Sequence, residues 1–393
     1  MCLWTYSYSE NKRTIAMSVF CSIFIFLYAI LVLTGIASCK KPPLNRAEVP
    51  VGALLPLTGR DSLYGREALR GLEIALKQIN LDRAVYNLKP IRLVIRDTQS
   101  KEGETSVVVR DLIYRQGVRA LIGEPDSGRS MEAAPIAERS GIPFISPAAT
   151  NDRLTKLGKY IFRTCFENSQ QARAMAKFAQ DAGFMRVAIL IDPSHEYSSN
   201  LGQAFETEFQ RRSGAVVTRQ NISDCRDFSP QLRSIQEAKP DLLVLPLLHV
   251  EGAIAARNIR ALGLKIPILG GDGWDTPDLV AWTDVIEGCY FITHFPPETE
   301  DFHSRRFAQN YQTLFGTSGT ALSALAHDAL LVLGEALRNT EKPAKIRENL
   351  LGIRDFPVAT GMFSFSRDRN PRKHVFVTRV EKGKFVPCAI ITN

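Results

Sequence analysis

Short apolar segments alternate with segments of helical periodicity along most of this chain. The first apolar segments cover residues 51–57, 91–97, 120–122 and 143–146, and the helical segments between them cover 64–80, 104–116 and 129–140. Consecutive parallel strands need long crossover connections, which are usually helices. The alternation therefore predicts an α/β fold in which a doubly wound parallel sheet carries helices on both faces.

The same alternation starts again after residue 163, so a second unit of similar size is expected. Its predicted strands cover 186–191, 215–221, 242–247, 266–269 and 288–295, and its predicted helices cover 169–182, 201–212, 228–238 and 250–262. Later segments predict helices at 300–315, 320–339 and 344–351, and β structure at 362–365, 375–380 and 385–386. Pro387 is expected to end the last of these strands, because proline lacks a backbone N–H group.

Composition limits the classes of protein that this chain can belong to. The chain has 393 residues, of which 45% are hydrophobic, and this is enough for two domains with substantial cores. Charged residues make up 23% without a long block of one sign, which argues against extensive disorder. The net charge of +8 is not gathered in a stripe of Lys and Arg with interleaved aromatics, so we expect a basic surface and no nucleic-acid partner.

The N-terminus has the pattern of an export signal. Lys12 and Arg13 precede an apolar run at 15–33, and small residues lead to Cys39. The sequence Ile-Ala-Ser-Cys resembles the bacterial lipobox, in which the cysteine is acylated and becomes the new first residue. A permanent transmembrane anchor is the alternative, because the run is nearly long enough to span a bilayer. We expect a signal peptide at 1–38 and a lipid-anchored tether at 39–48, in a protein exported to the periplasm or the cell surface.

Four cysteines remain in the exported part besides Cys39: Cys165, Cys225, Cys289 and Cys388. In an oxidising compartment they could form two disulfide bonds, in three possible pairings. Free buried thiols are the alternative reading. There is no C-x-x-C motif, so no metal site is expected.

Polar side chains follow several of the predicted strands, where doubly wound sheets bind their ligands. In the first unit, Tyr64, Ser127 and Thr150 lie at turns or helix starts, whose N–H groups and dipole suit an anion. In the second unit, Asp272 lies within I-L-G-G-D-G-W-D-T-P at 268–277. The glycines around Trp274 suggest that its indole is exposed in a cleft. Anion-binding groups on one unit and an acid on the other fit a zwitterion, of which an α-amino acid is the simplest example.

The motifs expected of an enzyme or a cofactor-binding protein are missing from the sequence. His195 and Glu196 could suggest acid–base chemistry, but none of the six histidines has metal-ligand spacing. There is no G-x-S-x-G elbow, no Walker loop and no G-x-G-x-x-G after a predicted strand. We therefore expect a binding protein without a cofactor rather than an enzyme.

Five short motifs occur in the order and spacing of one known family: Tyr64 with Gly65, G-E-P-D-S-G-R-S at 123–130, S-P-A-A-T at 146–150, H-E-Y at 195–197 and G-G-D-G-W-D at 270–275. Together they resemble the leucine/isoleucine/valine-binding proteins, which are the amino-acid receptors of ABC importers and have the type I periplasmic-binding fold. The similarity extends from about residue 49 to about residue 385.

The resemblance implies specific contacts with an amino acid. Ser127 would donate its hydroxyl to the ligand carboxylate. Thr150 would hold the carboxylate with its N–H group and reach the ammonium with its hydroxyl. The Ala148 carbonyl would accept a hydrogen bond from the ammonium, and Asp272 would pair with it.

The resemblance also implies two lobes joined by three crossings, near Cys165, Tyr290 and Ser366. Lobe 1 would comprise 49–165 plus 291–367, and lobe 2 would comprise 166–290 plus 368–393. Tyr64 and Tyr197 match aromatic walls of the pocket between the lobes.

The chain departs from the family pattern at the side-chain pocket. Leucine-type members often carry aromatic residues at the positions of Leu248 and Leu322. Asp126 and Arg129 are unusual near the pocket and could favour a polar ligand.

The resemblance implies a monomeric solute-binding lipoprotein that delivers an amino acid, possibly branched-chain, to the permease and ATPase subunits of an ABC importer. One alternative is a receptor of the same fold that reports its ligand to a signalling partner. Another is a receptor for an amide, a urea or an aromatic acid.

Overall fold

The structure is a computed structural model that describes residues 48–222, 228–295 and 300–392. The predicted signal peptide, Cys39 and Cys225 lie outside this described part. Among the described residues, no helix combines the length and the apolar character needed to cross a membrane.

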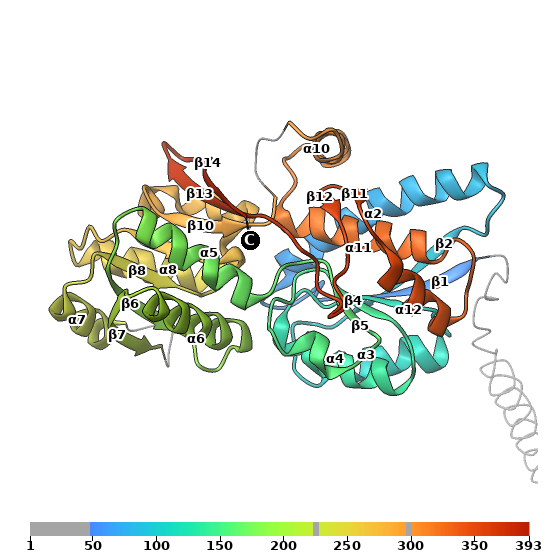
Figure 1. Cartoon of the computed structure of the whole chain (residues 1–393), viewed down its shortest axis with the longest axis horizontal. Helices are drawn as coiled ribbons and strands as arrows, with labels where there is room; N and C mark the ends of the chain where they lie inside the picture. Colours follow the sequence, from blue (N-terminus) through green and yellow to red (C-terminus); the bar gives the residue numbers. More distant parts are fainter. Residues whose placement is uncertain (1–47, 223–227, 296–299, 393) are drawn as a thin grey trace, which may run out of the picture. The chain divides into compact units, whose positions relative to one another are not determined.

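The first sheet has five parallel strands in the order β2-β1-β3-β4-β5 (Figure 1). They are β1 (Val49–Leu55), β2 (Ile91–Asp97), β3 (Leu121–Gly123), β4 (Phe144–Ser146) and β5 (Ile161–Arg163). The position of β1 between β2 and β3 reverses the direction in which strands are added. Helices therefore cover both faces, as the sequence predicts.

Helices of this unit pack on the two faces of the sheet through separate apolar clusters, and one of them, at 302–315, packs on other helices instead. The helices are α2 (Ser62–Val85), α3 (Glu104–Arg110), α4 (Ser127–Arg139), α10 (Phe302–Phe315), α11 (Ala321–Ala336) and α12 (Pro343–Gly352), with a π-helical turn at Asp111–Arg115 after α3 and a 3-10 turn at Leu154–Leu157. Val51 and Leu55 of β1 pack with α2 and α11, whereas Leu54 packs with α3 and α4 on the opposite face. The short strands β11 (Phe356–Val358) and β12 (Gly361–Phe363) pair with each other beside α11. We call this unit lobe 1.

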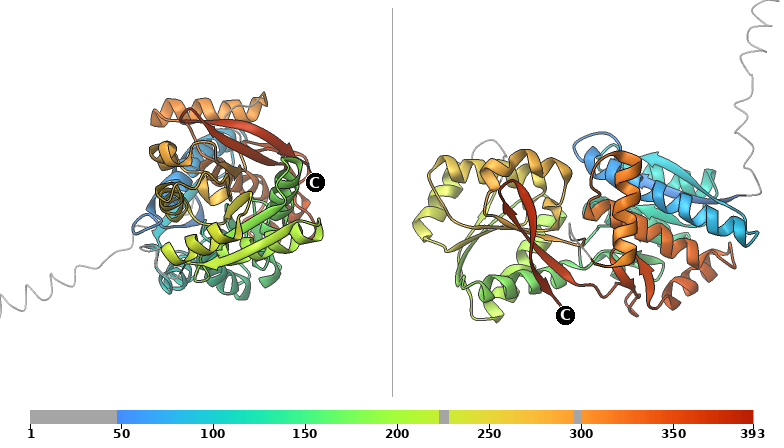
Figure 2. Two further views of the ribbon diagram at one scale, coloured as in Figure 1. Left: turned by 90° about the vertical axis from the view of Figure 1, so that its left-hand side faces the viewer. Right: turned by 90° about the horizontal axis from the view of Figure 1, so that it is seen from above.

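The second sheet has seven strands in the order β14-β13-β10-β9-β8-β6-β7. They are β6 (Arg186–Ile191), β7 (Ala215–Asn221), β8 (Leu242–Leu245), β9 (Ile268–Gly270), β10 (Tyr290–Thr293), β13 (Val375–Glu381) and β14 (Lys384–Ile391). The first five are parallel, and the C-terminal hairpin of β13 and β14 adds an antiparallel edge (Figure 2). We call this sheet and its helices lobe 2.

Alternate residues of β6 divide the core of lobe 2 into two clusters. The helices are α5 (Asn168–Asp181), α6 (Glu196–Arg211), α7 (Ser229–Ala238), α8 (His249–Ala261) and α9 (Thr283–Ile286), with 3-10 turns at Asp272–Trp274 and Pro277–Trp282. Val187 and Ile189 pack with α5 and α6, whereas Ala188 and Leu190 pack with α7 and α8. Successive side chains of β6 point to opposite faces of the sheet, and both faces are buried. This is why the sequence of β6 is apolar without alternation.

Two details of the sequence prediction are wrong. Strand β14 continues through Pro387, which pairs with Thr378 next to an irregularity in the register. Proline is tolerated there because β14 is the outermost strand and the ladder is already disturbed. The expected lobe boundary after residue 290 falls inside β10, which pairs with β9 and β13 of the second sheet.

Three connections join the lobes. The first runs from β5 to α5, the second from β10 to α10, and the third from the bridge between Phe365 and Pro371 to β13. Of the cysteines in the described part, Cys165 and Cys289 are buried and Cys388 is exposed, and all three are free thiols.

Candidate functional site

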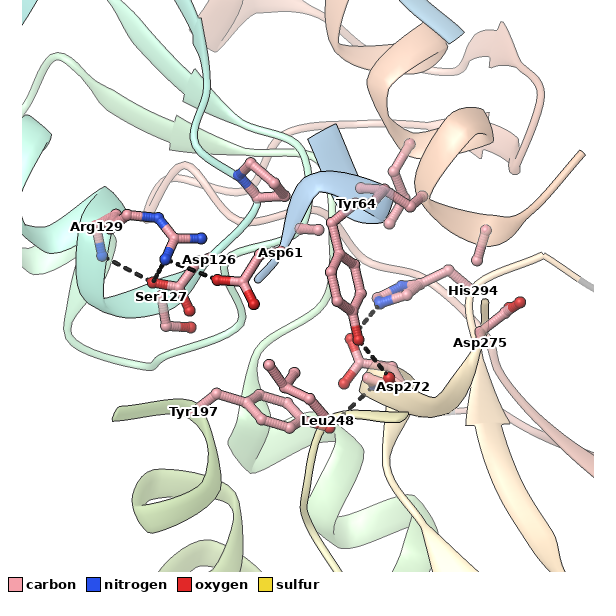
Figure 3. A pocket seen from close by; sticks show the side chains of 16 residues that line it. Asp61, Tyr64, Asp126, Ser127, Arg129, Tyr197, Leu248, Asp272, Asp275 and His294 are labelled. Carbon is pink, nitrogen blue, oxygen red and sulfur yellow. Dashed lines mark hydrogen bonds and ion pairs between the residues drawn. The ribbon is translucent and has the colours of Figure 1, made fainter. Parts of the chain in front are cut away.

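A cavity lies where the loops after the parallel strands of both sheets meet (Figure 3). Lobe 1 contributes Asp61, Tyr64, Pro125, Asp126, Ser127, Arg129, Ala148, Ala321, Leu322 and Leu325, and lobe 2 contributes Tyr197, Leu248, Asp272, Gly273, Asp275 and His294. The cavity volume is about 60 Å³, on a scale where one water molecule needs roughly 10–15 Å³. It therefore has room for a small ligand in contact with both lobes.

Five of the residues proposed as ligand contacts from the sequence line this cavity: Tyr64, Ser127, Ala148, Tyr197 and Asp272. Each follows a strand of one of the two sheets, so the strand-end argument brings together residues that are far apart in the sequence. The other two proposed residues, Thr150 and Trp274, do not line it.

Thr150 lies in the loop between β4 and β5 and is fully buried. Its carbonyl accepts a hydrogen bond from the backbone N–H of Asn168 at 2.8 Å. Its hydroxyl has no hydrogen-bond partner within the described structure. A buried hydroxyl without a partner costs free energy, so a ligand that reached Thr150 would satisfy it.

Trp274 does not face the cavity, and the expectation of an exposed indole is wrong. Its side chain is fully buried in the core of lobe 2, in the cluster that includes α7 and α8. A Cβ atom at Gly252 would lie 2.6 Å from the indole nitrogen, and one at Gly270 would collide with the ring. These two glycines therefore make room for a packed indole.

Asp272 is held in place by two neighbouring side chains. One carboxylate oxygen accepts from Nε2 of Gln171 at 2.8 Å, and the backbone N–H of Asp272 donates to Oε1 of Gln171 at 2.8 Å. The other oxygen lies 3.0 Å from Nε2 of His294. Burial lowers the pKa of His294, against the opposing effect of Asp272, so this ring is neutral and donates one N–H. A carboxylate accepts about four hydrogen bonds, so Asp272 retains acceptor capacity towards the cavity.

Two tyrosines from different lobes hold the backbone next to Asp272. The Tyr64 hydroxyl donates to the Gly273 carbonyl at 2.8 Å and lies 2.9 Å from Nδ1 of His249. The Gly273 N–H donates to the Tyr197 hydroxyl at 3.1 Å (Figure 3). Tyr64 belongs to lobe 1 and Gly273 to lobe 2, so this hydrogen bond connects the lobes at the cavity.

Helix α4 presents its N-terminus at the cavity wall. Asp126 is the N-cap, and its carboxylate accepts from the backbone N–H of Arg129 at 2.9 Å. Ser127 therefore does not cap the helix. Its hydroxyl lies in the first turn, where it accepts a long hydrogen bond of 3.4 Å from the N–H of Asn151.

Sequence reasoning did not identify several residues of the site. His294 follows β10, but the sequence prediction extends this strand to residue 295 and so places His294 inside it. Asp275 also lines the cavity and accepts from the Thr293 hydroxyl, and burial raises its pKa to about 7. Gln171 lies on α5 and has no sequence signal that distinguishes it from other helical glutamines.

Among the described residues, no cluster of His, Cys, Asp and Glu is arranged to hold a metal ion.

Comparisons with known proteins place this chain in a family. The profile of the family described as "Periplasmic binding protein" matches residues 48–384. The chain is 26% identical over 363 residues to the Leu/Ile/Val-binding protein BraC3 of Rhizobium johnstonii, an alignment that covers 91% of this chain and 98% of the relative. The chain therefore belongs to the periplasmic binding protein family.

Solved structures agree in fold. The crystal structure of the leucine-binding protein LivK of Thermotoga maritima has a TM-score of 0.81 and 31% identity, covering 88% of this chain and 99% of that one. The branched-chain amino acid substrate-binding protein LivJ of Streptococcus pneumoniae, in complex with isoleucine, has a TM-score of 0.82 and 25% identity, covering 88% and 100%. These relatives are solute-binding proteins, so the prediction that the chain is not an enzyme is confirmed.

Proposed function

We propose that this protein is the extracytoplasmic solute-binding component of an ABC importer and that it binds an α-amino acid in the cavity between its lobes. The family membership and the names of the relatives support the class of ligand. The observation that carries the proposal is the pairing of opposite chemistries across one cavity. Ser127 lies in the first turn of α4 on one wall, and the carboxylate of Asp272 lies on the other.

The two walls suit the two charged groups of an amino acid. The first-turn N–H groups and the Ser127 hydroxyl would bind the ligand carboxylate. The buried hydroxyl of Thr150 belongs to the residue before Asn151, whose N–H group donates to Ser127. The ammonium would donate to Asp272 and to the Ala148 carbonyl. A hydrogen bond to a charged group contributes about 1.5–3 kcal/mol. A few such bonds, less the ordering costs, correspond to micromolar affinity, which is about 8 kcal/mol.

Ligand binding in this arrangement requires the lobes to come together, because the groups proposed to bind the carboxylate belong to lobe 1 and the Asp272 carboxylate belongs to lobe 2. The Tyr64 hydrogen bond to Gly273 belongs to the closed arrangement. Opening would proceed by hinge motion at the three connections and would admit the ligand. The closed form would then be the one that the permease recognises.

Binding is tested by thermal unfolding in the presence of matched compounds. A ligand at a hundred times its dissociation constant stabilises a protein by about 2.7 kcal/mol. We expect stabilisation by at least one α-amino acid. We expect none from the corresponding amine without a carboxylate or from the corresponding acid without an ammonium. Stabilisation by an aromatic acid or by a simple amide, and by no amino acid, would contradict the proposal.

Membrane attachment is a separate part of the proposal, because Cys39 lies outside the described residues. A diacylated N-terminus would keep the receptor at the bilayer beside its permease. Metabolic labelling with radioactive palmitate should mark the wild type and leave Cys39→Ser unlabelled. Equal labelling of both proteins would exclude Cys39 as the acylated residue.

A further inference from the structure

Arg129 forms the centre of a buried charge cluster on the lobe 1 wall of the cavity (Figure 3). Its side chain is only 8% exposed. Nη1 lies 2.8 Å from Asp61 and 3.9 Å from Asp126, and Nε lies 3.0 Å from Glu124. One guanidinium therefore faces three carboxyl groups, of which those of Asp61 and Asp126 belong to residues that line the cavity.

The second terminal nitrogen of Arg129, Nη2, is buried and has no hydrogen-bond partner in the described structure. Leaving a charged donor unpaired in a buried position costs more free energy than a typical hydrogen bond contributes. By contrast, Nε and Nη1 each have a carboxylate oxygen within 3.0 Å. The cluster therefore offers one nitrogen with unsatisfied N–H groups beside the carboxylates of Asp61 and Asp126.

A second arginine offsets the carboxylates of this wall, because Nε of Arg60 lies 3.3 Å from Asp61. Burial raises the pKa of Glu124 to about 7, so this residue is only partly ionised near neutral pH. Burial would also raise the pKa of Asp126, but Arg129 and His195 outweigh that effect and hold the pKa below its usual value. His195 comes from lobe 2, with Nε2 3.4 Å from Asp126, so the cluster is completed across the lobes.

These features exclude two kinds of ligand side chain from this wall. An aliphatic side chain would cover two carboxylates and the Nη2 donor without giving any of them a partner. An acidic side chain could accept from Nη2, but it has no N–H group to donate to the carboxylates of Asp61 and Asp126 beside it. A neutral carboxamide or ureido group carries both N–H donors for the carboxylates and a carbonyl for Nη2.

The same cavity has an apolar part. Leu248, Leu322 and Leu325 line it together with the charge cluster. A side chain with a short methylene stem and a polar end would contact the leucines with its stem and the Arg129 cluster with its end. Glutamine and citrulline have this construction.

We propose that the ligand of this protein is an amino acid whose side chain ends in a neutral carboxamide or ureido group, recognised by Arg129 together with Asp61 and Asp126. The inference rests on the proposed amino-acid binding and specifies its side chain. It assigns to Arg129 the role of a specificity-determining residue that contacts the ligand.

Isothermal titration of the wild type with five free amino acids tests the inference: glutamine, citrulline, leucine, glutamate and lysine. We expect glutamine or citrulline to bind at least ten times more tightly than each of the other three. Tighter binding of leucine, glutamate or lysine would overturn the inference while leaving the proposed function intact. Binding of no amino acid by the folded protein would instead remove the proposed function on which the inference rests.

A pair of conservative variants tests the role of Arg129. Arg129→Lys keeps one positive charge but removes the planar donor set, so the affinity for the polar ligand should fall at least ten-fold. Arg119→Lys, at an exposed position in the same lobe, should leave that affinity unchanged. Circular dichroism checks that both variants fold. Should Arg129→Lys fail to fold, the selectivity of the wild type still decides the matter. Equal affinities in two folded variants would contradict a contact between Arg129 and the ligand.

Discussion

The hydroxyl of Tyr64 donates a hydrogen bond of 2.8 Å to the carbonyl of Gly273, and this bond connects the two lobes directly beside Asp272. The two residues are 209 positions apart in the sequence. Gly273 also donates to the Tyr197 hydroxyl within lobe 2, so its peptide groups are held from both sides. Tyr64 can therefore stabilise the closed arrangement and fix the loop that carries the acid.

Replacing Tyr64 with phenylalanine should weaken ligand binding without unfolding the protein. A hydrogen bond between neutral groups contributes about 0.5–1.5 kcal/mol. We expect Tyr64→Phe to raise the dissociation constant about two- to ten-fold, as measured by isothermal titration. Tyr114→Phe is the matched control, because this exposed tyrosine donates or accepts its bond to Ser140 far from the cavity. If both variants bound like the wild type, the bond between the lobes would have no role in closure.

A larger residue at Gly252 should destabilise lobe 2, because the indole of Trp274 occupies the space that a Cβ atom would need. Overpacking of this kind costs about 1–3 kcal/mol. We expect Gly252→Ala to lower the free energy of unfolding in urea by this amount. Gly352→Ala is the control: no atom lies within 4 Å of its Cβ position, so we expect no loss and even a small gain in helix stability. Equal stability of the two variants would show that Trp274 does not depend on Gly252.

Asp275 should make the stability of the protein fall as the pH rises. Its pKa is raised by burial from 3.8 to about 7, so the folded state favours the neutral acid. The contribution of Asp275 to the free energy of unfolding is fully present below about pH 4 and is lost as the pH rises to about 7. Between these values the carboxyl group is ionised in the unfolded chain while it is still neutral in the folded protein. An asparagine side chain in its place cannot ionise. Asp275→Asn should therefore gain stability relative to the wild type, by up to about 1.4 kcal/mol per pH unit in this window.

Urea unfolding at several pH values measures this difference. Asp82→Asn, at an exposed position on α2, is the matched control for the substitution itself. A constant difference for Asp275→Asn would mean that folding does not change the pKa of Asp275.

The fold could be predicted from the sequence because strand and helix periods alternate in nearly every segment. Strands β2, β6 and β7 have the predicted bounds, although only β6 is nearly continuous in apolar residues. The sequence prediction ends β14 too early, at Pro387. Proline disrupts a strand where a neighbouring strand needs its N–H group, but β14 is the outermost strand of its sheet. The boundary at β10 was missed because pairing in a sheet depends on neighbours that are distant in the sequence.

The site could be predicted only in part. Residues that directly follow strands, such as Ser127 and Asp272, could be found because parallel strands bring their ends together. Gln171 and the arrangement around Arg129 depend on side-chain packing, which has no local signal. Trp274 was misplaced because glycines beside a large aromatic residue can indicate either exposure or close packing, and the sequence does not distinguish them.

The central claim is that the Asp272 carboxylate binds the ammonium group of an amino acid. Isothermal titration of Asp272→Asn and Asp278→Asn with the amino acid that stabilises the wild type most strongly tests it directly. Loss of a charge-assisted hydrogen bond of about 1.5–3 kcal/mol should weaken binding to Asp272→Asn at least ten-fold, while the exposed control keeps the wild-type affinity. An Asp272→Asn protein that folds normally and binds the amino acid with wild-type affinity would contradict the account.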